Sequence, residues 1–108
     1  MAGCFLVAVV DELIVGRVSV RFALNEFLSV FGGHIGYAVL PEHRRRGLAT
    51  EILSQALVIA RSEGVDRVLV TCDEDNVGSA RTIERNGGVL ENRMIDPEGS
   101  VTRRYWID

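Results

Sequence analysis

The most chemically informative part of this sequence is a basic loop between an apolar segment and a segment with helical spacing. The first turn of a helix has backbone N–H groups without internal acceptors and lies at the positive end of the helix dipole, so it favours phosphate. Guanidinium groups beside such a turn add charge-assisted hydrogen bonds, and glycine permits close approach of a ligand. We therefore predict a phosphate-binding loop made of Arg44, Arg45, Arg46, Gly47, Leu48, Ala49 and Thr50.

The alternative interpretation of this loop is a solvated basic helix start. Cations at a helix N-terminus are disfavoured by a few tenths of a kcal/mol each, so three arginines there are better explained by a bound anion. The chain contains neither the Gly-x-x-x-x-Gly-Lys-Ser/Thr motif nor Gly-x-Gly-x-x-Gly after a strand. A nucleoside triphosphatase and a dinucleotide-binding fold are therefore not supported.

The elements that must position this loop follow from apolar periodicity. Segments with strand patterns are separated by two segments with helical spacing, the first ending near Gly64 and the second followed by Gly87 and Gly88. A strand–helix–strand unit in the middle implies a parallel pair, whereas the flanking hairpins imply antiparallel pairs. We predict one α/β (α+β) domain over residues 1–108 with a mixed, mostly antiparallel sheet and a central β-α-β crossover. The predicted order is β-β-β-α-β-α-β-β: residues 4–10, 13–23, 34–40, 48–63, 67–72, 77–86, 89–94 and 102–107.

Composition narrows the functional classes. The 108 residues are 47% hydrophobic and 25% charged, with a formal net charge of −3, which is an ordinary globular balance and does not favour nucleic acid. No apolar run approaches the roughly 20 residues needed to span a membrane, and we expect a cytoplasmic protein. Asp73, Asp75 and Glu84 partly match a calcium loop, but Val77 places no side-chain oxygen at its fifth position. We predict no metal, no membrane and no nucleic acid partner.

The basic loop and a second block together resemble the GNAT superfamily of acetyl-CoA-dependent N-acetyltransferases. The family signature is Arg/Gln-x-x-Gly-x-Gly/Ala after a strand, and residues 44–49 fit every position. The preceding residues 35–41 resemble the family's fourth strand. Residues 76–87 resemble the helix after its fifth strand. The resemblance runs from about Cys4 to Asp108 and implies the acyl-CoA acyltransferase fold of this superfamily, within an uncharacterised predicted-acetyltransferase branch.

The resemblance also implies roles for individual residues, with acetyl-CoA as cofactor. Backbone groups of Tyr37, Ala38 and Val39 would pair with the pantetheine arm as if it were another strand. The N–H groups of residues 45–50 would hold the pyrophosphate. Asn76 would hydrogen-bond the cofactor near the pantetheine, and Ser79 would contact the same arm.

The chain departs from the family pattern at two positions where catalytic residues are often found. The family often places a tyrosine proton donor where this chain has Ile83, and a carboxylate base where it has Thr71. His34 and Glu26 are the substitutes, because imidazole titrates near neutrality and Glu26 lies in a connection expected to border the acceptor. The competing interpretations are a hydrogen-bonded strand histidine and a solvated loop glutamate. Deprotonation of the amine through water is a further alternative.

The chain also lacks the strand and two helices that usually open a GNAT domain. Their absence would leave apolar surface uncovered, which predicts either a homodimer or a domain whose start lies upstream. The leading hypothesis is an N-acetyltransferase that acts on an amine of a small molecule or a protein. A non-catalytic acyl-CoA-binding or regulatory module is the alternative. An RNA- or phosphopeptide-binding domain is disfavoured by the acidic balance.

Overall fold

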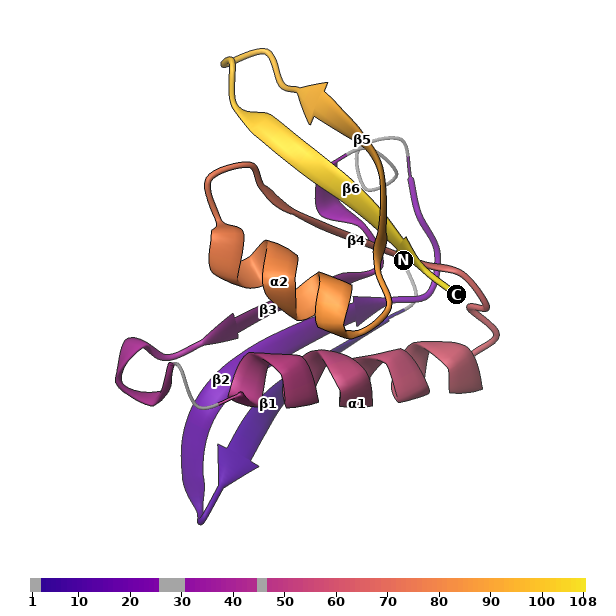
Figure 1. Ribbon diagram of the computed structural model, residues 1–108. Helices are drawn as coiled ribbons and strands as arrows, with labels where there is room; N and C mark the ends of the chain where they lie inside the picture. The colour runs from indigo at the N-terminus through magenta and orange to yellow at the C-terminus, as the bar shows by residue number, and fades with distance from the viewer. Residues whose placement is uncertain (1–2, 26–30, 45–46) are drawn as a thin grey trace.

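The computed structural model describes residues 3–25, 31–44 and 47–108. Within these residues the chain forms one six-stranded sheet and two α-helices, in the order predicted from the sequence (Figure 1). The elements are β1 (Gly3–Val10), β2 (Leu13–Arg21), β3 (Ile35–Val39), the 3₁₀ turn η2 (Pro41–His43), α1 (Leu48–Ser62), β4 (Val68–Asp73), α2 (Val77–Arg85), β5 (Val89–Ile95) and β6 (Val101–Ile107).

The sheet is mixed and mostly antiparallel, as the sequence predicts. Its strand order is β1-β2-β3-β4-β6-β5, and β3 and β4 form the parallel pair that α1 connects. Among the described residues this pair has a single registered position, Ile35 opposite Val70, whereas β2 and β3 pair over five positions and β4 and β6 over six. The two central strands therefore part soon after they meet, and this opens a space in the middle of the sheet.

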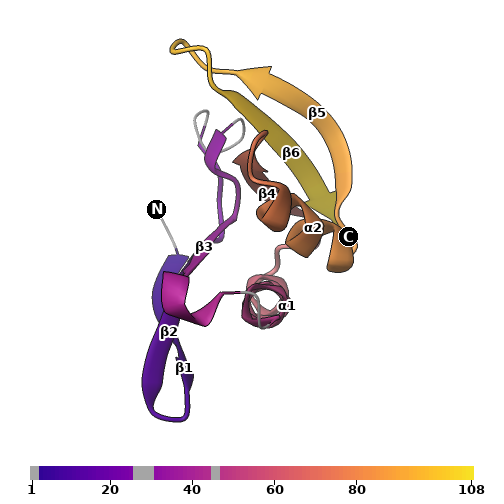
Figure 2. The same cartoon turned by 60° about the vertical axis from the view of Figure 1, so that its left-hand side comes forward.

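The first helix, α1, covers the middle of the sheet through one apolar face. Its fully or nearly buried residues recur at helical spacing, as amphipathic packing requires. Figure 2 shows the helix end-on beside β2 and β3, with α2 next to it. The buried face of α1 consists of Ile52, Leu53, Ala56, Leu57 and Ala60.

The second helix, α2, lies on the same side of the sheet and packs against α1. The side chain of Asn76 caps its N-terminus by accepting a hydrogen bond from the backbone N–H of Ser79 (3.0 Å). At the other end, Nδ2 of Asn86 donates to the backbone carbonyl of Thr50 at 3.2 Å, which attaches the end of α2 to the first turn of α1. No helix in the described part of the chain is long and apolar enough to cross a membrane.

Candidate functional site

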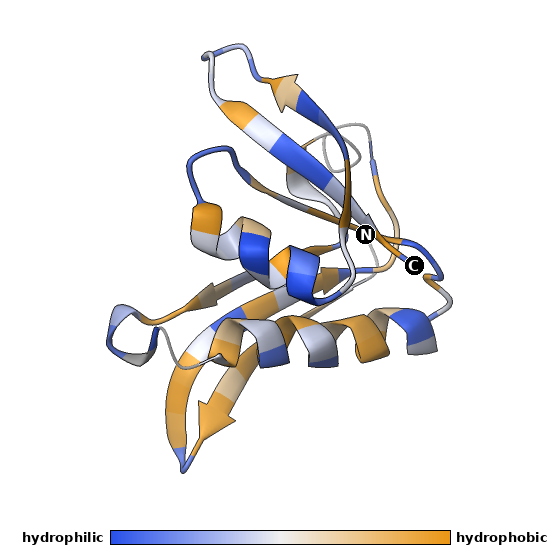
Figure 3. Ribbon diagram, in the orientation of Figure 1, coloured by the Kyte–Doolittle hydropathy of each residue, from blue (hydrophilic) through white to orange (hydrophobic). Residues whose placement is uncertain are grey.

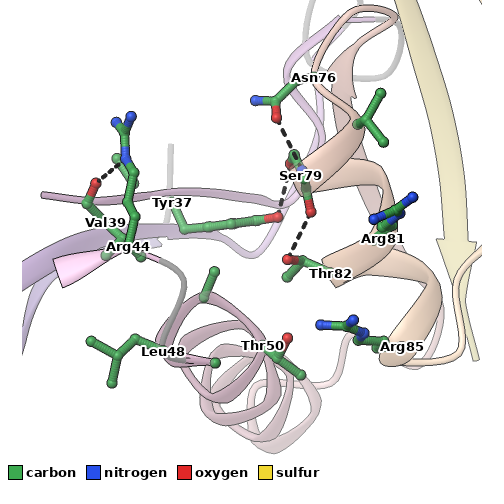
Figure 4. Close-up of a pocket in the computed structure, with 15 residues that line it drawn as sticks. Tyr37, Val39, Arg44, Leu48, Thr50, Asn76, Ser79, Arg81, Thr82 and Arg85 are labelled. Carbon is green, nitrogen blue, oxygen red and sulfur yellow. Dashed lines mark hydrogen bonds between the residues drawn. The ribbon is translucent and has the colours of Figure 1, made fainter. Parts of the chain in front are cut away.

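A cleft of about 760 Å³ opens where β3 and β4 part (Figure 4). Its walls come from β3, from the start of α1 and from α2, and these are the elements that carry the sequence motifs. Among the fifteen lining residues there is no aspartate or glutamate. The lining comprises Tyr37, Ala38, Val39, Arg44, Gly47, Leu48, Ala49, Thr50, Asn76, Val77, Gly78, Ser79, Arg81, Thr82 and Arg85.

The start of α1 presents free backbone amides to this cleft. Gly47 is the N-cap residue, and the first intrahelical hydrogen bond runs from the N–H of Glu51 to its carbonyl (3.2 Å). Helix geometry therefore leaves the N–H groups of Leu48, Ala49 and Thr50 without an intrahelical acceptor. These are three of the residues predicted to bind phosphate, and all three line the cleft.

Glycine is favoured at position 47 because of its backbone conformation and not because neighbouring atoms would exclude a side chain. Its φ is +74°, in the left-handed region where residues with a Cβ are strained. A Cβ built on Gly47 would meet nothing within 4 Å, so the space beside it is open. A ligand can therefore approach this backbone closely.

Three arginines of the described residues line the cleft, and sequence reasoning identified one of them. Arg44 lies at the β3 wall, where its Nε donates to the backbone carbonyl of Val39 at 3.0 Å. Arg45 and Arg46 lie outside the described residues. Arg81 and Arg85 reach the cleft from α2, and Figure 4 shows Arg85 extending toward Thr50. The spacing of four residues places them on one helix face, but the sequence does not reveal which element that face meets.

The edge of β3 that faces away from β2 can offer backbone N–H groups to a ligand beyond its one pair with β4. The N–H of Leu40 donates to the carbonyl of Val15 at 2.8 Å, so the backbone groups of alternate residues point toward β2. The N–H groups of Tyr37 and Val39 consequently point to the other edge, where β4 has moved away. This arrangement can accept an extended ligand arm in the manner of an added strand.

The side chain of Tyr37 points into the cleft, a role that sequence reasoning missed. Its hydroxyl oxygen lies 2.8 Å from Oγ of Ser79 on α2, and the two hydroxyl groups share a hydrogen bond (Figure 4). Burial raises the pKa of Tyr37 above its ordinary value of 10.0. The phenol therefore stays protonated at neutral pH, and the cleft contains a neutral pair of hydroxyl groups.

The two candidate bases have different outcomes. Glu26 lies outside the described residues. His34 is 7% exposed, and its Nδ1 accepts a hydrogen bond from the backbone N–H of Leu69 at 2.9 Å. Burial lowers the pKa of His34 below 6.5, so the ring is neutral at pH 7. His34 is not among the residues that line the cleft.

Ile83 and Thr71, the two positions where the sequence departs from the family pattern, each have a structural contact: one side chain is buried in the core and the other forms a hydrogen bond to a loop. Ile83 is completely buried in the core, and it does not line the cleft. Oγ1 of Thr71 donates to the backbone carbonyl of Phe31 at 2.6 Å, so this hydroxyl group holds a loop. Within the described residues, no three His, Cys, Asp or Glu side chains gather in a way that could hold a metal ion.

Comparison with known proteins agrees with this geometry. Residues 1–88 match the model of the acetyltransferase (GNAT) family. The uncharacterized N-acetyltransferase YjdG of Bacillus subtilis (strain 168) is 34% identical over 74 residues, which are 68% of this chain and 40% of that protein.

Two solved structures share the fold over nearly the whole chain. One is yncA from Salmonella typhimurium with its cofactor acetyl-CoA (TM-score 0.75, 17% identity, 98% of this chain and 64% of that one). The other is a variant of the spermidine N-acetyltransferase SpeG from Vibrio cholerae (TM-score 0.78, 16% identity, 95% and 63%). This chain thus spans less than two thirds of each of these relatives. The chain belongs to the acetyltransferase (GNAT) family.

Proposed function

We propose that this protein is an acetyl-CoA-dependent N-acetyltransferase domain. The observation that carries the proposal is the cleft between β3 and α2, with the free amides of Leu48, Ala49 and Thr50 at one end and the edge of β3 that faces away from β2 along its wall. A diphosphate fits the first feature and an extended amide-bearing arm fits the second. Acetyl-CoA contains both groups, and none of the described residues that line the cleft is a carboxylate that would repel it.

Direct transfer requires the neutral amine to attack the carbonyl carbon of the thioester. The resulting tetrahedral oxyanion collapses, the carbon–sulfur bond breaks and the thiolate receives a proton. We assign polarisation of the carbonyl to the N–H of Val39, which points to the cleft edge of β3, while its own carbonyl accepts from Arg44. Asn76 and Ser79 line the opposite wall and would contact the pantetheine arm.

We propose three routes for removal of the proton from the attacking amine. His34 is the first candidate: because Nδ1 accepts the N–H of Leu69, the neutral ring carries its proton on Nε2, so His34 would have to release Leu69 and take the amine proton on Nδ1. Glu26 is the second candidate, and transfer to solvent is the third route. The acceptor we propose is an amine of a small molecule or of a protein.

A non-catalytic acyl-CoA-binding module is the second candidate function. The observation that favours it is the burial of Ile83, which places an apolar side chain where the family often has a proton donor. Thiol release from acetyl-CoA over a panel of amines separates the two functions. The chain contains no lysine, so transfer to its own side-chain amines does not add to the signal. Release with none of the amines would favour the binding module.

Calorimetric titration with coenzyme A tests the cofactor site. We expect Gly47→Glu to abolish binding, because it places a side chain and a negative charge in the phosphate position. Gly47→Ala is the matched control, because it carries the same left-handed strain without the charge and its Cβ meets nothing within 4 Å. Thermal melts would verify that both variants fold. Wild-type affinity in a folded Gly47→Glu protein would contradict the assignment.

We also propose that the protein forms a homodimer through the β1–β2 hairpin. β1 is one of the two edge strands of the described sheet, and Figure 3 shows both strands of the hairpin as largely hydrophobic. The side chains of Phe5, Val7 and Leu13 are 67%, 54% and 59% exposed, and solitary soluble domains rarely leave such an apolar edge uncovered. Light scattering after size exclusion should give twice the chain mass, and Val7→Lys should give a monomer. A folded wild-type monomer at high concentration would contradict the dimer.

A further inference from the structure

Among the residues that the structure describes, two arginines of α2 have side chains without a hydrogen-bond or ion-pair partner, whereas most of the other described arginines have one. Within the described residues, neither Arg81 nor Arg85 forms a hydrogen bond or an ion pair. By contrast, Arg67, Arg93 and Arg103 each form a salt bridge. Free guanidinium groups that line a cleft are available to a ligand.

The attachment of α2 to α1 positions these two arginines. Asn86 donates to the carbonyl of Thr50 and also to the carbonyl of Thr82 (3.1 Å), so the last turn of α2 is held against the first turn of α1. Arg85 precedes Asn86, and Arg81 lies one turn earlier on the same face. Both therefore reach the cleft from the α2 wall, opposite Arg44 in Figure 4.

The cleft consequently holds more positive charge than one diphosphate requires. The free amides of α1 and the guanidinium group of Arg44 form one anion-binding region, and Arg44 is kept at the β3 wall by its bond to Val39. Arg81 and Arg85 add two positive charges on the other wall, in a chain whose net charge is −3 and in a cleft whose described lining contains no carboxylate. Cations that line one cleft repel each other, and an anion bound between them offsets this repulsion.

We infer that Arg81 and Arg85 form a second anion subsite that binds the 3′-phosphate of coenzyme A. This inference rests on the proposed function, because the ligand that delivers the phosphate is the acyl donor itself. Two guanidinium groups provide the forked donors that suit a phosphate dianion. The cleft should therefore distinguish coenzyme A from dephospho-coenzyme A, which differs from it only in lacking this phosphate.

Calorimetry with these two ligands on the full chain tests the inference. The wild-type protein should bind coenzyme A roughly tenfold or more tightly than dephospho-coenzyme A, the factor expected for charge-assisted hydrogen bonds. The double variant Arg81→Gln/Arg85→Gln should bind coenzyme A as weakly as dephospho-coenzyme A, with little change in affinity for the latter. Both positions are exposed on the helix, so the variant should keep its wild-type melting temperature.

Arg17→Gln is the matched control, because Arg17 is an exposed arginine of β2 that does not line the cleft. It removes the same charge and should leave both affinities unchanged. Equal affinity of the wild-type protein for the two ligands would overturn the inference while leaving the proposed function intact. An equal loss of both affinities in the double variant would also overturn it, because the arginines would then be contacting the diphosphate. Binding of neither ligand to the wild-type protein would overturn the proposed function, and the inference with it.

Discussion

The hydroxyl oxygens of Tyr37 and Ser79 lie 2.8 Å apart and connect β3 to α2 across the cleft. These residues are 42 positions apart in the sequence, and the walls they connect are the ones between which the donor arm is proposed to lie. The pair therefore links the two sides of the site before any ligand binds.

Replacement of Tyr37 by phenylalanine tests how much this link contributes. Tyr37→Phe keeps the ring and removes the hydroxyl group, and we expect a loss of about 0.5–1.5 kcal/mol in the free energy of unfolding. Ser79→Ala should cost a similar amount, and the double variant should cost less than the sum. Urea denaturation of the four proteins gives this cycle. Additive losses would mean that the two hydroxyl groups do not interact in solution.

Stability should depend on pH through His34. Because burial lowers the pKa of His34 below 6.5, the unfolded chain binds a proton more readily than the folded chain. The stabilising contribution of the neutral ring is therefore complete above pH 6.5 and is lost as the pH falls through its folded pKa. In His34→Asn, Oδ1 can still accept the N–H of Leu69 but does not titrate. Urea denaturation between pH 7.5 and 5.5 should show a decline in the wild-type protein and a flatter profile in the variant; identical slopes would contradict this role.

Asn76 should have two separable roles. Its Oδ1 caps α2 by accepting from the N–H of Ser79, which leaves its Nδ2 as a donor for the cofactor. Asn76→Ser retains a cap acceptor and should preserve stability while weakening the binding of coenzyme A. Asn76→Ala should weaken binding equally and also cost about 1 kcal/mol of stability. If Asn76→Ser bound coenzyme A normally, the residue would be a cap alone.

Replacement by alanine should change stability in opposite directions at Gly78, in the first turn of α2, and at Gly88, which follows the helix. A Cβ on Gly88 would lie 2.5 Å from Cγ2 of Ile83 and 2.9 Å from its carbonyl oxygen, so Gly88→Ala should cost about 1–3 kcal/mol. A Cβ on Gly78 would meet only Oδ1 of Asn76 at 3.8 Å, so Gly78→Ala should stabilise α2 by up to about 1 kcal/mol. Melting temperatures measure both effects. An unchanged melting temperature in Gly88→Ala would contradict the packing of Ile83.

Local patterns predicted the elements and the phosphate loop. The periodicity of α1 identified its buried face, from Ile52 to Ala60, because a helix that covers a sheet buries residues three and four apart. The predicted order of strands and helices was also confirmed, because the apolar period of each segment is a local property of the sequence. The position of Gly47 at the start of α1 was likewise readable, since the residues that form this turn are adjacent in the chain.

Features that depend on distant contacts were not readable. The approach of Arg81 and Arg85 to the cleft depends on the bond between Asn86 and Thr50, and no local pattern encodes which helix the end of α2 will meet. The sequence left His34 with two interpretations, because its partner Leu69 is 35 residues away. Such pairings are set by packing of the whole domain.

The single registered pair between Ile35 and Val70 has a mechanical consequence. Among the described residues, one further backbone bond crosses the same seam, from the N–H of His34 to the carbonyl of Leu69 (2.7 Å), together with the side-chain bonds of His34 and Thr71. By contrast, five or more paired positions hold each neighbouring central strand. The two three-stranded halves of the sheet therefore share a short hinge, and their mutual angle can change with the loss of few hydrogen bonds. Among the buried strand amides, deuterium uptake should be faster along this seam than in the pairs of β4 with β6, and a bound donor that spans both halves should slow it.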